Sequence, residues 1–426
     1  MSLQTALSGL NGAQTGLNTV SNDLANADTT AFKSQTAEFA DLYPYGSSNV
    51  PGLGVTTSAM DTNFSQGAPV STGNPLDAAI QGNGFFVVSQ NGTQEYTRDG
   101  SFELNSAGQL VSAATGAAVM GIGTSGALGP ITVNTGAMPA MATNTSNLAF
   151  NLSSNSTTTS TNYVPGVAPA VAYTESYPVT TYDSLGNANT VNLYFVPGTT
   201  GSDQYTVYAE PVTSTTTNTA YVTGGTTGTA MELGTLNFNT NGTLASFAAY
   251  TTNGAGAATG ITQTGTDGAT LPITWGNGSG PSNIDFNFTG TTLGAQSFAT
   301  AANNTNGYAP GNYSGTTINT AGQLIATYSN GQTITSGTLA IANFINEQGL
   351  SPLSGNLYAA TTTSGQPVID APGTGQAGSV AGGELEQSNA STSELLVSLI
   401  EYQQAYQANA SVIQTEQTDS TRLTQI

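Results

Sequence analysis

Residues that could support acid–base, nucleophilic or metal chemistry are scarce in this chain of 426 residues. It has no His and no Cys, which excludes Ser–His, Cys–His and His-rich metal constellations. The one lysine, Lys33, follows Phe32 in a Thr-rich stretch, and we interpret it as a solvated surface charge. Asp99 and Glu103, beside Arg98, are the most obvious carboxylate pair. Such a cluster in a hairpin is more often a local ion pair than an acid–base couple.

Metal, cofactor and sugar sites have no better support. Asp183 and Asp370 could join a calcium site, but no loop carries carboxylates at the alternating spacing that calcium requires. Trp275 is the single tryptophan, so no aromatic-lined surface is indicated. We therefore predict no catalytic, metal-binding or cofactor-binding residue, and no enzymatic activity.

The composition indicates a structural protein with a polar, weakly charged surface. Charged residues make up 6% of the chain, against roughly 25% in an average soluble domain. Three positive residues face 24 acidic ones, for a net charge of -21, so no basic patch for nucleic acid or an anionic membrane can form. We find no signal peptide and no apolar run near the roughly 20 residues of a membrane span. We expect no membrane insertion, and either a cytoplasmic location or a dedicated export route.

Both ends of the chain carry heptad patterns typical of helices that pair along a seam. Leucine recurs every seven residues from Leu3 to Leu24, and a second apolar series closes the chain. We predict that these helices build a shared core with copies of the same chain. The predicted seam residues are Leu3, Leu7, Leu10, Leu17, Val20 and Leu24 in the first helix, and Leu395, Leu399, Tyr402, Tyr406 and Ile413 in the second.

Glycines weaken the first helix and open one side of it. Gly9, Gly12 and Gly16 each cost about 1 kcal/mol relative to alanine inside a helix, so we expect this helix to order mainly when packed. Their spacing puts them on one stripe, where a neighbouring backbone can come close. The second helix has a capping box, Ser391 with Glu394, ahead of its apolar run.

Periodicity and composition divide the chain into segments. The predicted fold class is mainly β, with two or more β domains, one inserted in the other, and long N- and C-terminal α-helices forming a coiled-coil assembly core. The predicted segments are a terminal helical core domain at 1–28 and 385–426, an extended connector at 29–72, an inner β domain at 73–145 and 299–361, an inserted outer β domain at 146–298, and a C-terminal connector at 362–384.

Short motifs place strands within the two β domains. Phe85–Val88 is a buried-strand run, and Asn91–Gly92 and Asp99–Gly100 are hairpin-turn signals in the inner domain. In the Thr-, Ser-, Gly- and Asn-rich outer domain, the turn Asp183–Asn187 precedes an alternating apolar run at Val191–Phe195. We predict an all-β outer domain with long polar loops.

Motifs at both ends and in the middle resemble the bacterial flagellar rod and hook protein family, in the family's order. They are Ala6–Leu10, Ser21–Ala27, Phe32–Lys33, Thr72–Asp77, Ile80–Phe86, Tyr96–Phe102, Gly383–Asn389 and Tyr402–Asn409. The chain departs from the family at Asp28, usually asparagine, and at Ala31, usually glycine. Rod members share both ends. The resemblance to hook members in particular rests on Tyr182–Asn187, Val191–Phe195 and Ala342–Leu350.

The resemblance implies a subunit of the flagellar hook, a flexible curved tube that acts as a universal joint and transmits torque from rod to filament. Terminal helices would surround a central channel, the inner β domain would form the tube wall, and the outer domain would lie outside. The implied partners are further copies of the chain, the distal rod protein, the hook–filament junction protein, the hook cap or scaffold protein, the hook-length ruler and the flagellar type III export gate.

The implied location is extracellular, in the hook, reached through the type III channel without a signal peptide. By the same resemblance, the export gate would recognise the segment containing Phe39, Leu42 and Tyr43. The alternative for these side chains is that they only pack the connector onto the wall domain.

Two other functions fit part of the sequence. A distal rod subunit would share both terminal motifs but would be stiff and would not need a compliant outer domain. A surface adhesin or polysaccharide-binding β protein would share the polar composition, yet the sequence offers it no aromatic-lined site.

Overall fold

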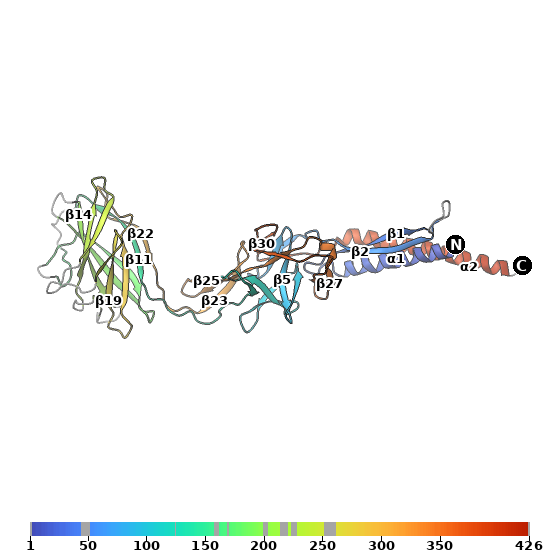
Figure 1. Cartoon of the computed structure of the whole chain (residues 1–426), viewed down its shortest axis with the longest axis horizontal. Helices are drawn as coiled ribbons and strands as arrows, with labels where there is room; N and C mark the ends of the chain where they lie inside the picture. Colours follow the sequence, from blue (N-terminus) through green and yellow to red (C-terminus); the bar gives the residue numbers. More distant parts are fainter. Residues whose placement is uncertain are drawn as a thin grey trace. The chain divides into compact units, whose positions relative to one another are not determined.

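The computed structural model describes residues 2–43, 52–123, 125–156, 162–167, 170–198, 203–213, 220–222, 228–250 and 261–424. The fold is mainly β with an α-helix at each end (Figure 1), which confirms that part of the predicted fold class. The chain separates into two compact units: unit 1 comprises Met1–Thr135, Ser314–Thr327 and Thr333–Ile426, and unit 2 comprises Gly136–Tyr313 and Tyr328–Gln332. Within the described residues, neither helix is long and apolar enough to cross a membrane.

The terminal helices of unit 1 are α1 (Ser2–Ala25) and α2 (Thr392–Thr424). Helix α1 ends before the expected Asp28, because the chain turns there: Thr29 N–H donates to the Asn26 carbonyl at 3.1 Å. Helix α2 begins directly after Ser391, the predicted N-cap, whose carbonyl accepts the Leu395 N–H at 2.9 Å. Capping residues thus mark the start of the second helix as the sequence indicates.

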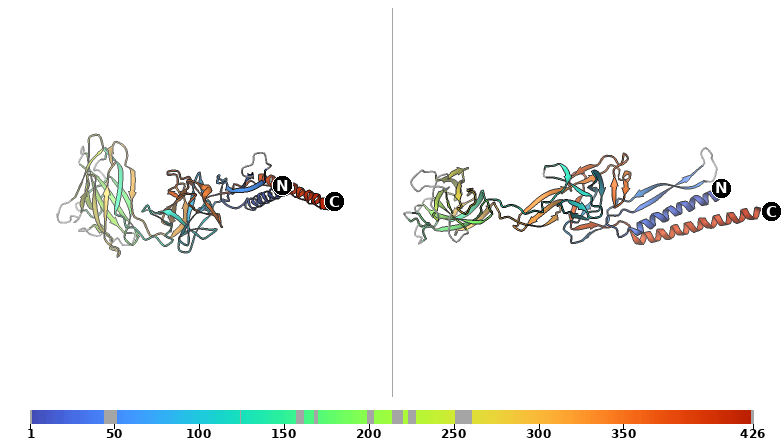
Figure 2. Two further views of the ribbon diagram at one scale, coloured as in Figure 1. Left: turned by 45° about the vertical axis from the view of Figure 1, so that its right-hand side comes forward. Right: turned by 90° about the horizontal axis from the view of Figure 1, so that it is seen from below.

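A two-stranded antiparallel hairpin, β1 (Gln35–Leu42) with β2 (Gly54–Thr62), follows α1 and lies against it (Figure 2). The buried Asp23 carboxylate joins the two elements by accepting the Gln35 N–H at 3.0 Å, and burial raises the pKa of Asp23 to about 6. The hairpin occupies much of the segment that the sequence predicts as an extended connector. Residues 44–51 of that segment lie outside the described residues.

The large sheet of unit 1 brings together segments from both halves of the chain. Its main path runs β23 (Tyr313–Ile318), β24 (Gln323–Tyr328), β25 (Thr333–Leu339), β9 (Ala118–Ile122), β5 (Phe85–Gln90), β6 (Thr93–Thr97), β28 (Leu357–Ala359) and β27 (Ser351–Leu353). Attached to it are β7 (Phe102–Leu104), β8 (Leu110–Ser112), β10 (Leu128–Pro130), β26 (Ile341–Asn343) and β29 (Val368–Asp370). A short 3-10 helix, η1 (Glu347–Gly349), follows β26.

Two further antiparallel pairs tie the C-terminal segment back to the N-terminal half of unit 1. They are β3 (Pro69–Ser71) with β31 (Glu384–Glu386), and β4 (Ala78–Gln81) with β30 (Ser379–Gly382). Because β31 leads into α2 and β3 follows the hairpin, this pairing fixes where the helices leave the sheets.

The core of unit 1 follows the predicted strand run. The side chains of Phe85–Val88 are fully buried in β5, and Phe85 packs edge-on against Phe344 with ring centroids 6.0 Å apart. The Asn91–Gly92 turn joins β5 to β6 with φ of 51° and 83°, the two positive values that this turn type needs. Both predictions are confirmed.

The Asp99–Gly100 hairpin prediction is wrong. Strand β6 before it pairs with β5 and β28, whereas β7 after it pairs with β8. Gly100 is required for a different reason: its backbone lies against that of Ala78, where an added Cβ would overlap the Ala78 carbonyl. A close approach of two backbones leaves room only for glycine.

Unit 2 is built from two sheets. One contains β15 (Tyr221–Val222), β18 (Thr262–Thr264), β19 (Gly268–Thr274), β20 (Ser282–Asn287), β11 (Thr145–Ser153), β21 (Thr292–Gly294) and β22 (Ala299–Thr305), and the other contains β12 (Glu175–Tyr182), β13 (Ala188–Pro197), β14 (Gln204–Val212), β16 (Met231–Phe238) and β17 (Leu244–Ala249). Phe150 of the first and Phe195 of the second meet with ring centroids 5.0 Å apart, inside one shared apolar core. The two sheets therefore pack face to face as a sandwich.

The turn Asp183–Asn187 joins β12 to β13 as the sequence predicts. The buried Asp183 carboxylate accepts side-chain amide hydrogens from Asn187 at 3.0 Å and Asn277 at 2.6 Å, and backbone N–H groups of the turn. Burial alone would raise the pKa of Asp183, but these hydrogen bonds outweigh it and lower the pKa. The carboxylate thus holds the β12–β13 turn to the loop after β19.

Asp183→Asn is expected to destabilise unit 2 by about 1–3 kcal/mol at pH 7. The new side-chain NH2 group would face the N–H groups that donate to the carboxylate in the wild type, so donors would meet donors. Since the folded pKa lies below the unfolded one, this stabilisation is complete at neutral pH and is lost as the pH falls below about 4. Urea denaturation followed by Trp275 fluorescence reports unit 2, since Trp275 is buried in its core. The exposed Asp203→Asn variant is the control, and equal unfolding midpoints for the two variants would contradict this role.

Candidate assembly surfaces and a buried charge cluster

The two terminal helices lie side by side and run antiparallel (Figure 2). A Cβ added at Gly9 would lie 2.8 Å from Asn409 Oδ1, and one added at Gly16 would overlap the Tyr402 ring. Moving one heptad forward along α1 therefore corresponds to one heptad backward along α2. The missing side chains of these two glycines make room for the larger residues of α2.

Gly12 serves a different neighbour. A Cβ added there would lie 3.4 Å from Phe39 Cε1 and 3.4 Å from Val55 Cγ1, on the two strands of the hairpin. Ser8 Oγ also accepts the Val55 N–H at 3.2 Å. Helix α1 is thus packed between α2 and the β1–β2 hairpin, and its glycines face two partners rather than the single stripe expected from their spacing.

The predicted seam residues of α1 are divided between buried and exposed positions. Val20 is buried, together with Ala6 and Ala13, which repeat at the same heptad position. By contrast, Leu3 is 47% exposed and Leu7 50% exposed. The remaining seam residues of α1, Leu10, Leu17 and Leu24, are half-buried. Within one chain, small side chains therefore take the buried positions and leucines remain partly uncovered.

Helix α2 shows the same division. Its predicted seam residues are all half-buried: Leu395, Leu399, Tyr402, Tyr406 and Ile413. A second apolar set on the helix is exposed: Leu396, Val397, Ile400 and Val412. Contiguous apolar side chains left in water commonly mark an interaction surface. We call the exposed apolar residues of α1 and α2 together the uncovered helix face.

The three residues of the proposed export segment lie at the far end of β1. Phe39 packs on Gly12 and is 37% exposed, whereas Leu42 and Tyr43 are 41% and 69% exposed. Phe39 therefore has a packing role in the folded chain, Leu42 is exposed to a similar degree, and Tyr43 stands largely in solvent.

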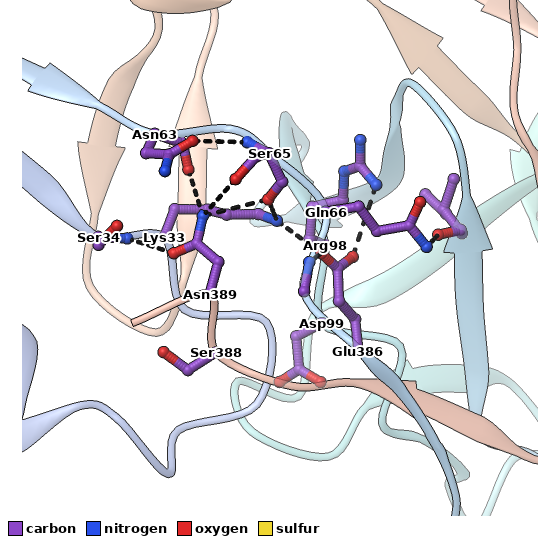
Figure 3. Close-up of polar contacts among 12 residues, drawn as sticks. Lys33, Ser34, Asn63, Ser65, Gln66, Arg98, Asp99, Glu386, Ser388 and Asn389 are labelled. Carbon is purple, nitrogen blue, oxygen red and sulfur yellow. Dashed lines mark hydrogen bonds and ion pairs between the residues drawn. The ribbon is translucent and has the colours of Figure 1, made fainter. Parts of the chain in front are cut away.

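A buried charge cluster joins the N-terminal segment, the strand region and the C-terminal segment of unit 1 (Figure 3). The Glu386 carboxylate on β31 accepts hydrogen bonds from Lys33 Nζ at 2.6 Å and from the Gly67 N–H at 2.7 Å. Its other oxygen faces Arg98 Nη1 at 3.5 Å. The Lys33 and Glu386 side chains are fully buried, and that of Arg98 is 3% exposed. Two of the chain's three cationic side chains thus share one carboxylate.

The electrostatics of this cluster follow from its burial. Burial lowers the pKa of Lys33, and the hydrogen bond and charge of Glu386 oppose that shift. The same competition, with burial again dominant, lowers the pKa of Arg98, whose guanidinium also lies 5.4 Å from the centre of the Phe85 ring. Burying either cation without a counter-charge would cost free energy of folding, so the Glu386 carboxylate stabilises both Lys33 and Arg98 in the folded chain.

Asn389 extends the cluster toward the helices. Its Oδ1 accepts the Ser34 N–H at 2.8 Å, and its Nδ2 donates to the Asn63 carbonyl at 2.7 Å and the Ser65 carbonyl at 3.1 Å. Lys33 Nζ also donates to the Ser65 carbonyl, at 2.7 Å. Residues far apart in the chain are therefore locked together just before α2 begins.

This cluster corrects two predictions. Lys33 is not a solvated surface charge but one of the most buried side chains. Arg98 pairs with Glu386 rather than with Asp99 or Glu103. The Asp99 carboxylate accepts the Ser101 N–H at 3.0 Å instead, and Glu103 is exposed. Two of the chain's three cations, Lys33 and Arg98, lie in motifs that resemble the flagellar rod and hook family. This placement was a signal in the sequence, but it did not identify Glu386 as their partner.

The other candidates for chemistry lie apart from one another. Among the described residues, no three His, Cys, Asp or Glu side chains gather in a way that could hold a metal ion. Asp183 lies in unit 2 and is occupied by amide donors, whereas Asp370 lies in unit 1 on β29. Trp275 is buried and donates to Ser282 Oγ at 2.9 Å, so it is not on the surface where it could stack on a sugar.

Family models match four stretches of the chain in order. They are described as flagella basal body rod protein (residues 3–33), flagellar hook protein FlgE/F/G D1 domain (79–152), flagellar basal body protein FlaE D2 domain (166–308) and flagellar basal body rod FlgEFG protein C-terminal (381–426). The first and last include α1 and α2, and the two middle ones lie in the β part of the chain.

Curated relatives match over almost the whole chain. The flagellar hook protein FlgE of Salmonella typhimurium (strain LT2) is 35% identical over 98% of this chain and 97% of its own length. Those of Escherichia coli (strain K12) and Treponema pallidum (strain Nichols) are 34% and 30% identical with the same coverage. The solved structure of Helicobacter pylori flagellar hook protein FlgE2 has a similar fold, with a TM-score of 0.52 at 12% identity over 75% of this chain and 99% of that one. Near full-length similarity at this identity shows that the chain belongs to the flagellar hook protein family.

Proposed function

We propose that this chain is the structural subunit of the bacterial flagellar hook and that it self-assembles into a flexible curved tube. The proposal is carried by one observation, the near full-length match to hook proteins at up to 35% identity. The distal rod alternative is not favoured, because the full-length relatives are hook proteins and the match includes the whole middle of the chain. No enzymatic role is needed to explain any buried polar group described above.

The uncovered helix face supports a role for the terminal segments, 1–28 and 385–426, as the assembly core. In the isolated chain α1 and α2 pair with each other, but leucines of α1 and apolar residues of α2 remain exposed. Burial of such a face contributes about 25 cal/mol per Å² of apolar surface. We expect neighbouring copies to cover it and to form a coiled-coil inner layer around a channel.

We assign the wall of the tube to the inner β domain, predicted at 73–145 with 299–361, and the outside to the inserted domain, predicted at 146–298. Unit 2, Gly136–Tyr313 with Tyr328–Gln332, extends beyond the predicted inserted domain at both ends. The segments 29–72 and 362–384 would connect the wall to the helical core. A bending tube needs outer contacts that lengthen and shorten at small energetic cost. Polar, weakly charged surfaces suit this, since water-mediated contacts can exchange. A large dry apolar interface between outer domains would argue against it.

The test is polymerisation of the purified full-length chain. We expect tubes visible by negative-stain electron microscopy, and no tubes from a variant ending at Ala390, which lacks α2. A full-length chain that remains monomeric while correctly folded would contradict the proposed function.

The proposed location is the extracellular hook, reached through the flagellar type III channel. Further proposed partners are the distal rod protein, the hook–filament junction protein, the hook cap or scaffold protein, the hook-length ruler and the export gate. Membership of the family supports these partners as a group.

Phe39→Ser is expected to abolish secretion while leaving expression intact, if the export gate recognises Phe39, Leu42 and Tyr43. Immunoblots of culture medium and cells measure both quantities. Met60→Ser is the matched control, since Met60 is another exposed apolar residue of the same hairpin, at 44% exposure. Normal secretion of the Phe39 variant would leave Phe39 only its packing role against Gly12.

A further inference from the structure

Asp23 lies in the last turn of α1, and its carboxylate connects that helix to the first residue of β1. Asp23 is 1% exposed. Its Oδ2 accepts the Gln35 N–H at 3.0 Å, whereas its Oδ1 is buried and has no hydrogen-bond partner among the described residues. A carboxylate has about four acceptor sites, so a charged Asp23 leaves most of them unsatisfied. We call this contact between Asp23 and Gln35 the α1–β1 junction.

No cation of the chain is placed to neutralise this carboxylate. The chain has three cationic side chains, and two of them, Lys33 and Arg98, pair with Glu386. The third, Arg422, lies in the last turn of α2, whereas the residues of α2 near Asp23 belong to the start of that helix. The last turn of α1 has no basic residue, and the carbonyl end of a helix disfavours a negative charge.

The elements packed around Asp23 also supply no positive charge. A cavity of about 260 Å³ beside Asp23 is lined by α1, β1 and the start of α2, which lies next to the end of α1 (Figure 2). The ionisable side chains that line it, besides Asp23, are Glu394 and Tyr402 of α2. The residues of β1 that line it, Gln35–Ala37, are uncharged. On β2, which pairs with β1, the nearest ionisable residue is Asp61, opposite Thr36.

A carboxyl group in these surroundings is easier to bury neutral than charged. Burying an unpaired charge costs much more free energy than burying a neutral group that keeps one hydrogen bond. A proton on Oδ1 removes the charge and leaves Oδ2 available to accept the Gln35 N–H. Burial accordingly raises the pKa of Asp23 to about 6, opposed by the hydrogen bond from Gln35. The charge on Asp23 therefore changes in mildly acidic solution.

We propose that Asp23 makes the α1–β1 junction sensitive to pH: its neutral form holds the end of α1 against the hairpin, and its charged form loosens that contact. The hairpin and α2 both pack on α1, so the protonation state of one side chain sets how firmly the terminal segments are held in a single chain. This is a property of the folded monomer, and it does not depend on the proposed function.

The direction of the pH dependence follows from the two states of the junction. The pKa of Asp23 is about 6 in the folded chain and 3.8 for the same group in water. The closed junction therefore retains a proton that the open junction releases. The stabilisation from the neutral form is complete below about pH 4 and is lost as the pH rises through 6.

Hydrogen exchange of the full chain, measured on peptides that cover residues 21–37, tests this proposal, because it reports local opening. Wild type and Asp23→Asn are compared at the same pH, so the intrinsic exchange rates cancel. Asparagine keeps an oxygen for the Gln35 N–H and does not ionise. We expect the opening constant of the wild type, divided by that of Asp23→Asn, to rise roughly 50-fold between pH 4 and pH 7. A ratio that stays constant over this range would overturn the proposal.

Two further variants separate Asp23 from other carboxylates. Asp41→Asn is the matched control, since Asp41 is exposed near the far end of the same strand, and its ratio should not change with pH. Glu394→Gln should keep most of the pH dependence, because burial rather than a neighbouring charge raises the pKa of Asp23. A pH dependence that persists in Asp23→Asn and disappears in Glu394→Gln would assign the effect to Glu394 and reject the proposal.

Discussion

Glu386→Gln is expected to destabilise unit 1 by about 3–5 kcal/mol, the usual cost of breaking a buried ion pair by removing one partner. The variant leaves Lys33 and Arg98 buried side by side with no negative charge between them. Their mutual repulsion and lost hydration then act against the folded state. Because β31 leads directly into α2, we also expect the start of α2 to lose its anchor.

Hydrogen exchange of unit 1 and urea denaturation of the full chain measure this effect. Trp275 fluorescence serves as an internal reference, since it reports unit 2, which should be unaffected. Glu103→Gln is the matched control, an exposed glutamate of the same unit. Lys33→Met should cost less than Glu386→Gln, because Arg98 keeps its partner. Equal unfolding of the Glu386 and Glu103 variants would show that the cluster contributes little.

Gly16→Ala is expected to raise the critical concentration for polymerisation by roughly 5- to 30-fold, the equivalent of about 1–2 kcal/mol. The added Cβ would overlap the Tyr402 ring, so α2 must shift or the ring must leave its position. Overpacking of this kind costs about 1–3 kcal/mol, only partly offset by the higher helix propensity of alanine. A displaced α2 would also present its exposed apolar residues at the wrong place.

Gly12→Ala is the control on the same helix. Its Cβ would meet Phe39 and Val55 at 3.4 Å, close to ordinary van der Waals contact, while the gain in helix propensity is the same. We expect a critical concentration equal to or below that of the wild type, measured by sedimentation of polymer at a series of chain concentrations. If both variants polymerise alike, contact between Gly16 and Tyr402 does not govern assembly.

Local signals in the sequence predicted local structure well. The start of α2 after Ser391, the buried strand at Phe85–Val88 and the turn at Asn91–Gly92 all depend on residues close together in the chain, and they are confirmed. The Asp99–Gly100 error has the opposite origin. Gly100 is required because its backbone lies against that of Ala78, on a different strand, and no local pattern could reveal that contact.

The candidate site could be predicted from the sequence only in part, because it too depends on contacts between residues far apart in the chain. Lys33 and Glu386 are separated by 353 positions, so no local pattern connects the two charges, and a surface lysine was the simpler interpretation. The heptads did locate the helices, but both Leu3 and Ala6 repeat at seven-residue spacing. Which series faces inward depends on α2 and the hairpin, and the structure buries the small one.

Immunogold electron microscopy of intact flagella, with antibody raised against residues 147–300 of this chain, tests directly whether the chain is a hook subunit. We expect gold confined to the short curved segment between the cell envelope and the filament. Gold at the envelope alone, along the filament, or over the cell surface would contradict it and would assign the chain to the rod, the filament or the surface instead.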